Sequence, residues 1–276
     1  MENKTTHIIK ASGKVEPFSI EKLKSSLKRS GADDIIIEDI AQEVAAHLFE
    51  GMTTRKIYQL AFRLLNKRQK PVAAKYSIKK AIMALGPSGF PFEKYISVLL
   101  GALGYKVIVN QFLQGACVTH EVDIIAEDEK SVCIVECKYH NLQGVVCDIK
   151  VPLYVDSRFR DIKANIKSDH KEYQCWIVTN TKFSADSLQY GNCVGQHLLS
   201  WDYPAKDNLK ELIDRLKLYP VSCLTSLSKR EKQLLLERGI ILCKDLIPNA
   251  SLLAAYDIGG TRVTTIINEA MNLSAA

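Results

Sequence analysis

The sequence predicts a multidomain protein of mixed α+β and α/β class. With 276 residues, the chain is longer than one hydrophobic core usually holds. Apolar residues recur at helical spacing in some stretches and with a period of two in others. The three domains are expected at residues 1–86, 87–218 and 219–276. They are a small β-hairpin with a helical bundle, a mixed-sheet αβββαβ core, and an all-α module.

The charge of the chain is unevenly distributed. Residues 1–90 hold 16 Lys and Arg against 9 Asp and Glu, whereas residues 91–220 hold 15 against 17 and residues 221–276 hold 6 against 5. The positive excess therefore belongs to the N-terminal third. It indicates an anionic ligand there, with a solvated basic face as the alternative.

The composition predicts a cytoplasmic protein. No apolar run approaches the roughly 18 residues that span a bilayer, and the N-terminus lacks the apolar core of a secretory signal. The eight cysteines form no C-x-x-C pair, and several lie within apolar runs. We expect reduced, mostly buried thiols and no membrane partner.

The first domain begins with a hairpin. Residues 8–10 and 15–18 are short apolar stretches joined by a turn at Gly13. Helices follow over residues 20–27, 39–49, 53–64 and 71–85. Ser19 and Thr53 are placed to cap the first and third of them.

This domain resembles the ATP-cone, the nucleotide-binding regulatory domain of ribonucleotide reductases and of the repressor of their genes. The resemblance rests on Lys10-x-x-Gly13-x-x-Glu16-x-Phe18-Ser19-x-x-Lys22-Leu23, on Gly51-Met52-Thr53-Thr54, and on Val72-Ala73-Ala74-Lys75-Tyr76.

The ATP-cone resemblance implies ATP or dATP as a regulatory ligand that is sensed and not hydrolysed. Lys10 and Lys22 would meet phosphates, Glu16 and Ser19 would line the adenosine end or the metal-linked phosphates, and Thr54 would add a hydroxyl at a helix start. Lys75 completes the implied set. The alternative is a cone that has lost its ligand and serves dimerisation.

The middle domain begins with a helix over residues 92–103. Strands are expected at 107–109, 121–126 and 131–138, then a helix over 150–167, a strand at 175–180, a helix over 183–190 and a strand at 196–200. Because side chains alternate along a strand, Glu136 and Lys138 share one face and Cys137 lies on the other.

Asp123, Glu136 and Lys138 across this hairpin resemble the PD-(D/E)-x-K nucleases. Within that class the resemblance is to the Mrr-type restriction endonucleases, because the preceding helix reads Phe92-Glu93-x6-Leu100-x3-Gly104-Tyr105. The alternative is an ordinary hairpin with solvated charges.

The nuclease resemblance implies a catalytic, Mg²⁺- or Mn²⁺-dependent site. Asp123 and Glu136 would hold the cation through oxygen atoms, and Lys138 would orient the attacking water. Glu93 and Glu121 would support the ligand set. His120 would act as a base or contact phosphate, unless it is an ordinary surface or core histidine. Arg158, Arg160 and Lys163 would contact phosphates or simply be solvated; the two interpretations are even.

The last domain reads as helices around a Gly259-Gly260 turn, preceded by a helix over residues 228–237. This order is similar to a helix-hairpin-helix, whose turn offers backbone amides to a DNA phosphate. A structural cap or dimerisation module is equally compatible with the nearly neutral charge, since Arg262 alone stands by the turn.

The combined hypothesis is a nucleotide-gated, metal-dependent endonuclease that acts on DNA as a homo-oligomer, with RNA as an open alternative. A second hypothesis is a non-catalytic nucleotide sensor that binds DNA through an inactive nuclease fold. A third is a scaffold that the cone assembles.

Overall fold

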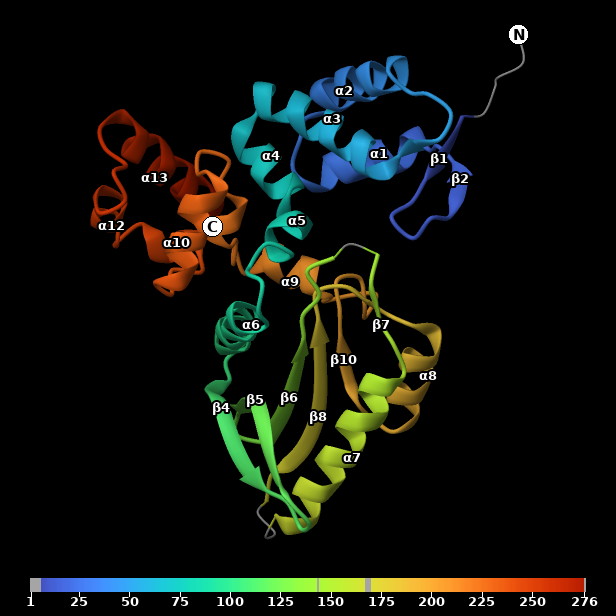
Figure 1. Ribbon diagram of the computed structural model, residues 1–276, viewed down its shortest axis with the longest axis vertical. Helices are drawn as coiled ribbons and strands as arrows, with labels where there is room; N and C mark the ends of the chain where they lie inside the picture. Colours follow the sequence, from blue (N-terminus) through green and yellow to red (C-terminus); the bar gives the residue numbers. More distant parts are fainter. Residues whose placement is uncertain (1–5, 143, 167–169, 276) are drawn as a thin grey trace. The chain divides into compact units, whose positions relative to one another are not determined.

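The computed structural model describes residues 6–142, 144–166 and 170–275, and the chain in it forms two compact units (Figure 1). The first unit comprises the chain up to Ala81 together with Tyr219–Leu235 and the part from Leu242 onward. The second comprises Ile82–Leu218 and Leu236–Ile241. The mixed multidomain class is confirmed. The boundaries 1–86, 87–218 and 219–276 stay a prediction.

The first unit opens with a small three-stranded sheet of order β2-β1-β3. Its strands are β1 (His7–Ile9), β2 (Val15–Pro17) and β3 (Met52–Thr53). The expected hairpin is confirmed, because β1 and β2 pair antiparallel around the Gly13 turn, where φ is +82°. The parallel strand β3 escaped prediction, since two residues are too few to show an alternation.

Helices α1 to α4 share a hydrophobic core with this sheet, and the short helix α5 follows them in the chain. Ser19 caps α1 by accepting from Lys22 N, and Thr53 caps α3 by accepting from Lys56 N, as expected. The second helix begins earlier than expected, because Asp33 caps it through Ile36 N. The bounds are α1 (Ile20–Arg29), α2 (Asp34–Ala46), α3 (Thr54–Arg68), α4 (Lys70–Tyr76) and α5 (Ile78–Ile82).

The core of this region is continuous from the sheet to the helices. Each helix contributes apolar residues at three- and four-residue spacing, which explains why the pattern predicted them. Fully buried members include Leu27 from α1, Ile40 and Val44 from α2, and Leu65 from α3.

A mixed five-stranded sheet organises the second unit, in the order β10-β8-β6-β5-β4. Neighbours among β4, β5 and β6 run antiparallel, and β6, β8 and β10 run parallel. The strands are β4 (Lys106–Gln114), β5 (Thr119–Glu127), β6 (Ser131–Lys138), β8 (Glu172–Thr179) and β10 (His197–Leu199). A separate parallel pair joins β7 (Val146–Cys147) and β9 (Lys182–Phe183).

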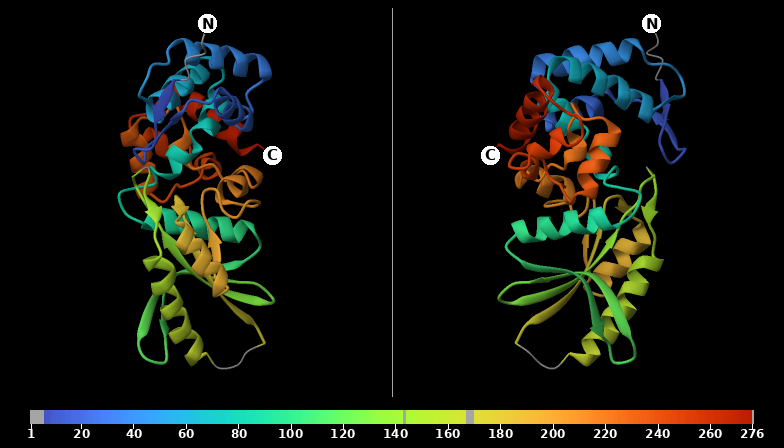
Figure 2. Two further views of the ribbon diagram at one scale, coloured as in Figure 1. Left: turned by 90° about the vertical axis from the view of Figure 1, so that its right-hand side faces the viewer. Right: turned by 60° about the vertical axis from the view of Figure 1, so that its left-hand side comes forward.

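Four helices belong to this unit: α6 (Phe90–Ala102), α7 (Lys150–Asn165), α8 (Ala185–Cys193) and α9 (Leu209–Arg215). Helix α6 packs against β4, β5 and β6, whereas α7 packs against β8 and α8 (Figures 1 and 2). The predicted end of the α7 helix at Lys167 lies outside the described residues. The observed αβββαβ order is the predicted one.

The C-terminal segment is helical, as expected. It contains a 3₁₀ turn (Val221–Cys223) and helices α10 (Lys229–Glu237), α11 (Cys243–Leu246), α12 (Ser251–Ala254) and α13 (Thr261–Ser274). The turn before α13 uses Gly260 at φ +59°, a conformation that favours glycine.

Two expectations from composition can be compared with the fold. Among the helices of residues 6–142, 144–166 and 170–275, none has both the length and the apolar character needed to cross a bilayer. All eight cysteines are free thiols, and six of them are buried. The expectation that most of the thiols are buried is therefore confirmed.

Candidate functional site

Strands β5 and β6 bring two acidic side chains together at one end of their pairing. The register pairs Ile124 with Val135, so Asp123 and Glu136 occupy the next positions along the two antiparallel strands. There the backbone N–H of Cys137 donates to Asp123 Oδ2 at 2.7 Å. The Asp123 carboxylate is thus held against β6, beside Glu136.

The electrostatics show that these acids share one environment. Burial raises the pKa of Asp123, and the Cys137 N–H opposes that rise by stabilising the carboxylate. Burial is also the main cause of the raised pKa of Glu136, and the negative charge of Asp123 raises that pKa further. Arg158 opposes the rise at Glu136. Two partly buried carboxylates therefore repel each other here.

Glu93 joins this group from the first turn of α6. Burial raises its pKa to about 7, and the charges of Asp123, Glu136 and Glu121 add to the rise. Lys138, at the end of β6, is exposed and counters the negative charge near Asp123 and Glu136. The structure thus gathers five of the six residues predicted to be catalytic.

The sixth residue, His120, points elsewhere. Its Nε2 lies 2.7 Å from Oδ2 of Asp161, on α7. Asp161 also accepts from the N–H groups of Cys117 at 2.8 Å and Val118 at 3.2 Å. His120 therefore belongs to a contact that fastens the β4–β5 turn to α7.

The three basic residues of α7 that were considered as phosphate contacts have three different environments. Arg158 Nη1 donates to Glu136 Oε2 at 2.7 Å, and both side chains are largely buried. Arg160 is mostly exposed and pairs with Asp156 in the same helix at 2.8 Å. Lys163 has its ammonium nitrogen 5.8 Å from the ring centroid of Phe159. Arg158 alone of the three contacts a predicted site residue.

Cation binding can be judged from the donor set. Among the described residues, no group of three or more His, Cys, Asp or Glu side chains is arranged to hold a metal ion. Asp123 and Glu136 nevertheless offer hard carboxylate oxygens, and each uses only one oxygen in the hydrogen bonds above. Mg²⁺ is commonly bound by one or two carboxylates with its waters retained. The donor chemistry fits such an ion, with Glu93 as a third acid nearby.

A second candidate site lies in the first unit. A pocket of about 290 Å³ opens between the hairpin, α1, α3 and α4, a volume near the lower end for small-molecule sites. Glu16 Oε2 lies 2.7 Å from Lys10 Nζ, and this contact holds the pKa of Glu16 below its usual value. Five of the six residues predicted to bind a nucleotide line the pocket: Lys10, Glu16, Ser19, Lys22 and Thr54.

Lys75 is the predicted residue that does not line this pocket; its ammonium group lies 5.8 Å from the ring centroid of Tyr219. The pocket contains instead two aromatic residues that the sequence interpretation missed. Tyr58 and Tyr76 stack with ring centroids 5.1 Å apart and planes 8° apart. A signal existed for Tyr58, because it follows Thr54 by one helical turn and so shares its face of α3.

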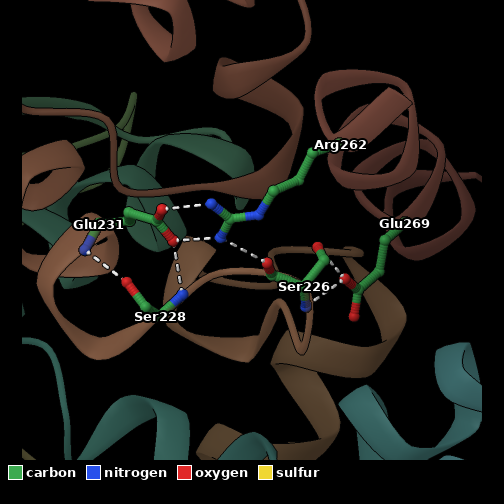
Figure 3. Close-up of polar contacts among 5 residues, drawn as sticks. All are labelled: Ser226, Ser228, Glu231, Arg262 and Glu269. Carbon is green, nitrogen blue, oxygen red and sulfur yellow. Dashed lines mark hydrogen bonds and ion pairs between the residues drawn. The ribbon is translucent and has the colours of Figure 1, made fainter. Parts of the chain in front are cut away.

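The C-terminal segment uses its charged residues internally (Figure 3). Arg262 donates to both carboxylate oxygens of Glu231, each at 2.7 Å. Glu269 accepts from the N–H groups of Thr225 at 2.6 Å and Ser226 at 3.0 Å. Arg262, the residue by the predicted DNA-binding turn, is therefore committed to an intramolecular ion pair.

Comparison with known proteins matches both ends of the chain. The ATP cone domain family matches residues 6–82, which confirms the ATP-cone resemblance. Residues 219–274 match a family described as AF1548-like, C-terminal. Neither family is described as a nuclease.

A curated protein and a solved structure are each similar to a larger part of the chain. An uncharacterized protein of Archaeoglobus fulgidus is 35% identical over 149 residues, which are 54% of this chain and 82% of the relative. A crystal structure titled as the protein of unknown function AF1548 has a TM-score of 0.55 and 29% identity. It covers 68% of this chain and 100% of that one.

Proposed function

We propose that this member of the AF1548-like family, which carries an ATP cone over residues 6–82, is a nucleotide-regulated, metal-dependent nuclease acting on DNA. The observation that carries this proposal is the gathering of Asp123, Glu136 and Lys138 at the end of the β5–β6 pairing. Two partly buried acids with an exposed lysine beside them suit phosphodiester hydrolysis.

Each residue has a defined role in the proposed reaction. Asp123 and Glu136 would hold a Mg²⁺ or Mn²⁺ ion, with Glu93 and Glu121 as supporting acids. When bound, the cation polarises the phosphate and makes a water molecule more acidic. Lys138 orients the attacking water and offsets the negative charge that develops on the phosphate. We leave His120 out of this set because it is bound to Asp161.

The cone supplies the proposed regulation. The pocket lysines Lys10 and Lys22 both lie near Glu16, at 2.7 and 3.7 Å. The phosphates of ATP or dATP would compete with Glu16 for these two cations, which links ligand binding to the hairpin that carries Lys10 and Glu16. Assembly into a homo-oligomer is the proposed means by which this local change reaches the nuclease site.

The test is cleavage of a panel of DNA and RNA substrates by the full chain. Reactions contain Mg²⁺ or Mn²⁺, with and without ATP or dATP. Asp123→Asn and Lys138→Ala should each lower the rate at least about 100-fold. Glu129→Gln and Lys130→Ala, on the exposed β5–β6 turn, are the matched controls. Cleavage that persists in the two site variants would refute the mechanism.

Two observations favour a second function. Arg158 occupies one oxygen of Glu136, and the described residues contain no complete metal-ligand group. A non-catalytic, nucleotide-sensing protein that binds DNA through this fold would have the same features. Calorimetry separates the two: a Mn²⁺ site that is lost in Glu136→Ala supports the nuclease, and the absence of any such site supports the sensor.

A further inference from the structure

One face of α7 leads from solvent to the candidate active site. Lys150, Tyr154 and Arg158 follow one another at intervals of four residues, so they lie on the same side of the helix. Lys150 is exposed and Tyr154 is 60% exposed, whereas the Arg158 side chain is only 14% exposed. The face therefore passes from water into the interior within two helical turns.

Arg158 connects the exposed ring of Tyr154 to the carboxylates. The guanidinium carbon lies 5.3 Å from the centroid of the Tyr154 ring, and Nη1 lies 2.7 Å from Glu136 Oε2. Tyr154 is thus separated from the proposed cation ligand by one side chain. The guanidinium also fixes the position of the ring, because a cation over an aromatic face is attracted to it.

The chemistry around this ring suits a nucleic-acid strand. Lys150, one helical turn before Tyr154 on the same face of α7, is an exposed cation. A second exposed cation, Lys138, lies at the end of β6, where its charge acts on Glu136. An exposed aromatic ring beside cations can stack a base while the cations meet the phosphates. A base inside a duplex has both of its faces covered by neighbours, so only an unpaired base can take this position.

We propose that the substrate of the candidate active site carries an unpaired base next to the phosphate to be cleaved, and that Tyr154 is the platform on which this base stacks. The proposal rests on the proposed nuclease function and specifies its substrate class. Single strands, flaps, bulges and flipped nucleotides share this chemistry. A blunt, fully paired duplex lacks it.

The experiment measures binding without cleavage, in EDTA and in the Asp123→Asn background. Fluorescence anisotropy follows three labelled oligonucleotides: a single strand, the same strand with abasic positions, and a blunt duplex. Tyr154→Ala should weaken binding of the single strand about 5- to 50-fold, which corresponds to the loss of one stacked base. Tyr154→Phe, which keeps the ring, should restore that affinity.

Two controls make the result specific. Phe112→Ala removes another exposed aromatic side chain, on β4, and should leave every affinity within about twofold of the parent. The abasic strand offers no base to stack, so its affinity should not respond to Tyr154→Ala.

Several outcomes would overturn the inference. One is that Tyr154→Ala binds the single strand as tightly as its parent does. Another is that Tyr154→Ala weakens binding of the abasic strand or of the duplex as much as it weakens binding of the single strand. A change of oligomeric state in Tyr154→Ala, seen by light scattering, would assign the ring to a contact between copies of the chain.

If the parent binds no nucleic acid at all, the proposed function fails with the inference. If it cleaves DNA while the Tyr154 variants behave as wild type, the inference alone fails.

Discussion

The imidazole of His120 is bound to the carboxylate of Asp161, with 2.7 Å between Nε2 and Oδ2. The contact joins two segments 41 residues apart, and Asp161 also accepts from two backbone N–H groups of the β4–β5 turn. The pair therefore fastens the far end of this hairpin to α7. This contact is the reason why we leave His120 out of the proposed catalytic set.

We expect His120→Gln and Asp161→Asn to lower stability and to spare the reaction. Each change removes a hydrogen-bonded charge contact, so the melting temperature should fall by about 2–4 °C. Cleavage per folded molecule should stay within about threefold of wild type. Differential scanning fluorimetry and a cleavage time course at a temperature below both transitions provide the measurements. A 100-fold slower reaction in folded His120→Gln would return His120 to the catalytic set.

The sequence predicts much of the candidate active site because its main signals are local. Asp123 lies in the middle of β5 and Glu136 two residues before the end of β6, and the period of two along each strand determines which side chains share a face. The order of strands and helices along the chain and the helix caps at Ser19 and Thr53 follow from equally local patterns.

Other features depend on distant segments and leave no local signal. Arg158 reaches Glu136 across 22 residues, and its helical spacing is compatible with a solvated position. The same applies to Arg262, which reads as a phosphate ligand beside a glycine turn but pairs with Glu231, 31 residues away. In both cases only the folded structure shows that the basic side chain pairs with a carboxylate of the same chain and not with an anionic ligand.

The Arg158–Glu136 pair should contribute measurably to the stability of the cation-free protein. Both side chains are more than four-fifths buried. Arg158→Met therefore leaves the Glu136 carboxylate without its positive partner, next to the negative charge of Asp123. We expect a loss of about 1–3 kcal/mol in the free energy of unfolding, between the values for exposed and fully buried pairs. Urea unfolding in EDTA measures it.

A double-mutant cycle identifies the cause of that loss. Arg158→Met combined with Glu136→Gln should recover at least about 1 kcal/mol, because the second change removes the unpaired charge. Arg160→Met is the matched control: its side chain is 68% exposed, and its pair with Asp156 should contribute at most about 1 kcal/mol. Additive losses in the cycle would show that Arg158 acts through packing alone.

Tyr58→Phe should separate nucleotide binding from folding. The Tyr58 hydroxyl is buried and has no hydrogen-bond partner among the described residues, although its ring lines the pocket. Removing an unsatisfied hydroxyl should leave stability unchanged or raise it by up to about 1 kcal/mol. If a bound nucleotide satisfies that hydroxyl, the affinity for ATP should fall about 3- to 10-fold.

Calorimetry with ATP and dATP, together with thermal melts, measures both effects. Tyr76→Phe is the control, since the Tyr76 hydroxyl already interacts with Ser26 and its removal should cost stability. A less stable Tyr58→Phe protein with unchanged affinity would show that the hydroxyl serves the fold.

Glu231 should make the C-terminal segment sensitive to acid. Its hydrogen bonds with Arg262 lower its pKa from the ordinary 4.5 to about 2, with Ser228 adding to the effect. A folded-state pKa below the unfolded one stabilises the fold above about pH 4.5, and this contribution is lost as the pH falls towards 2.

The expected size of this effect is about 1–2 kcal/mol at pH 7. The full pKa difference would give more, but Arg262 is nearly half exposed and water screens the pair. Urea unfolding of wild type, Glu231→Gln and Arg262→Met between pH 7 and pH 3 tests it. Both variants should be less stable than wild type at pH 7, and the difference should shrink steadily below pH 4.5. A difference that does not depend on pH would mean that the side chains stabilise the segment by packing and not by charge.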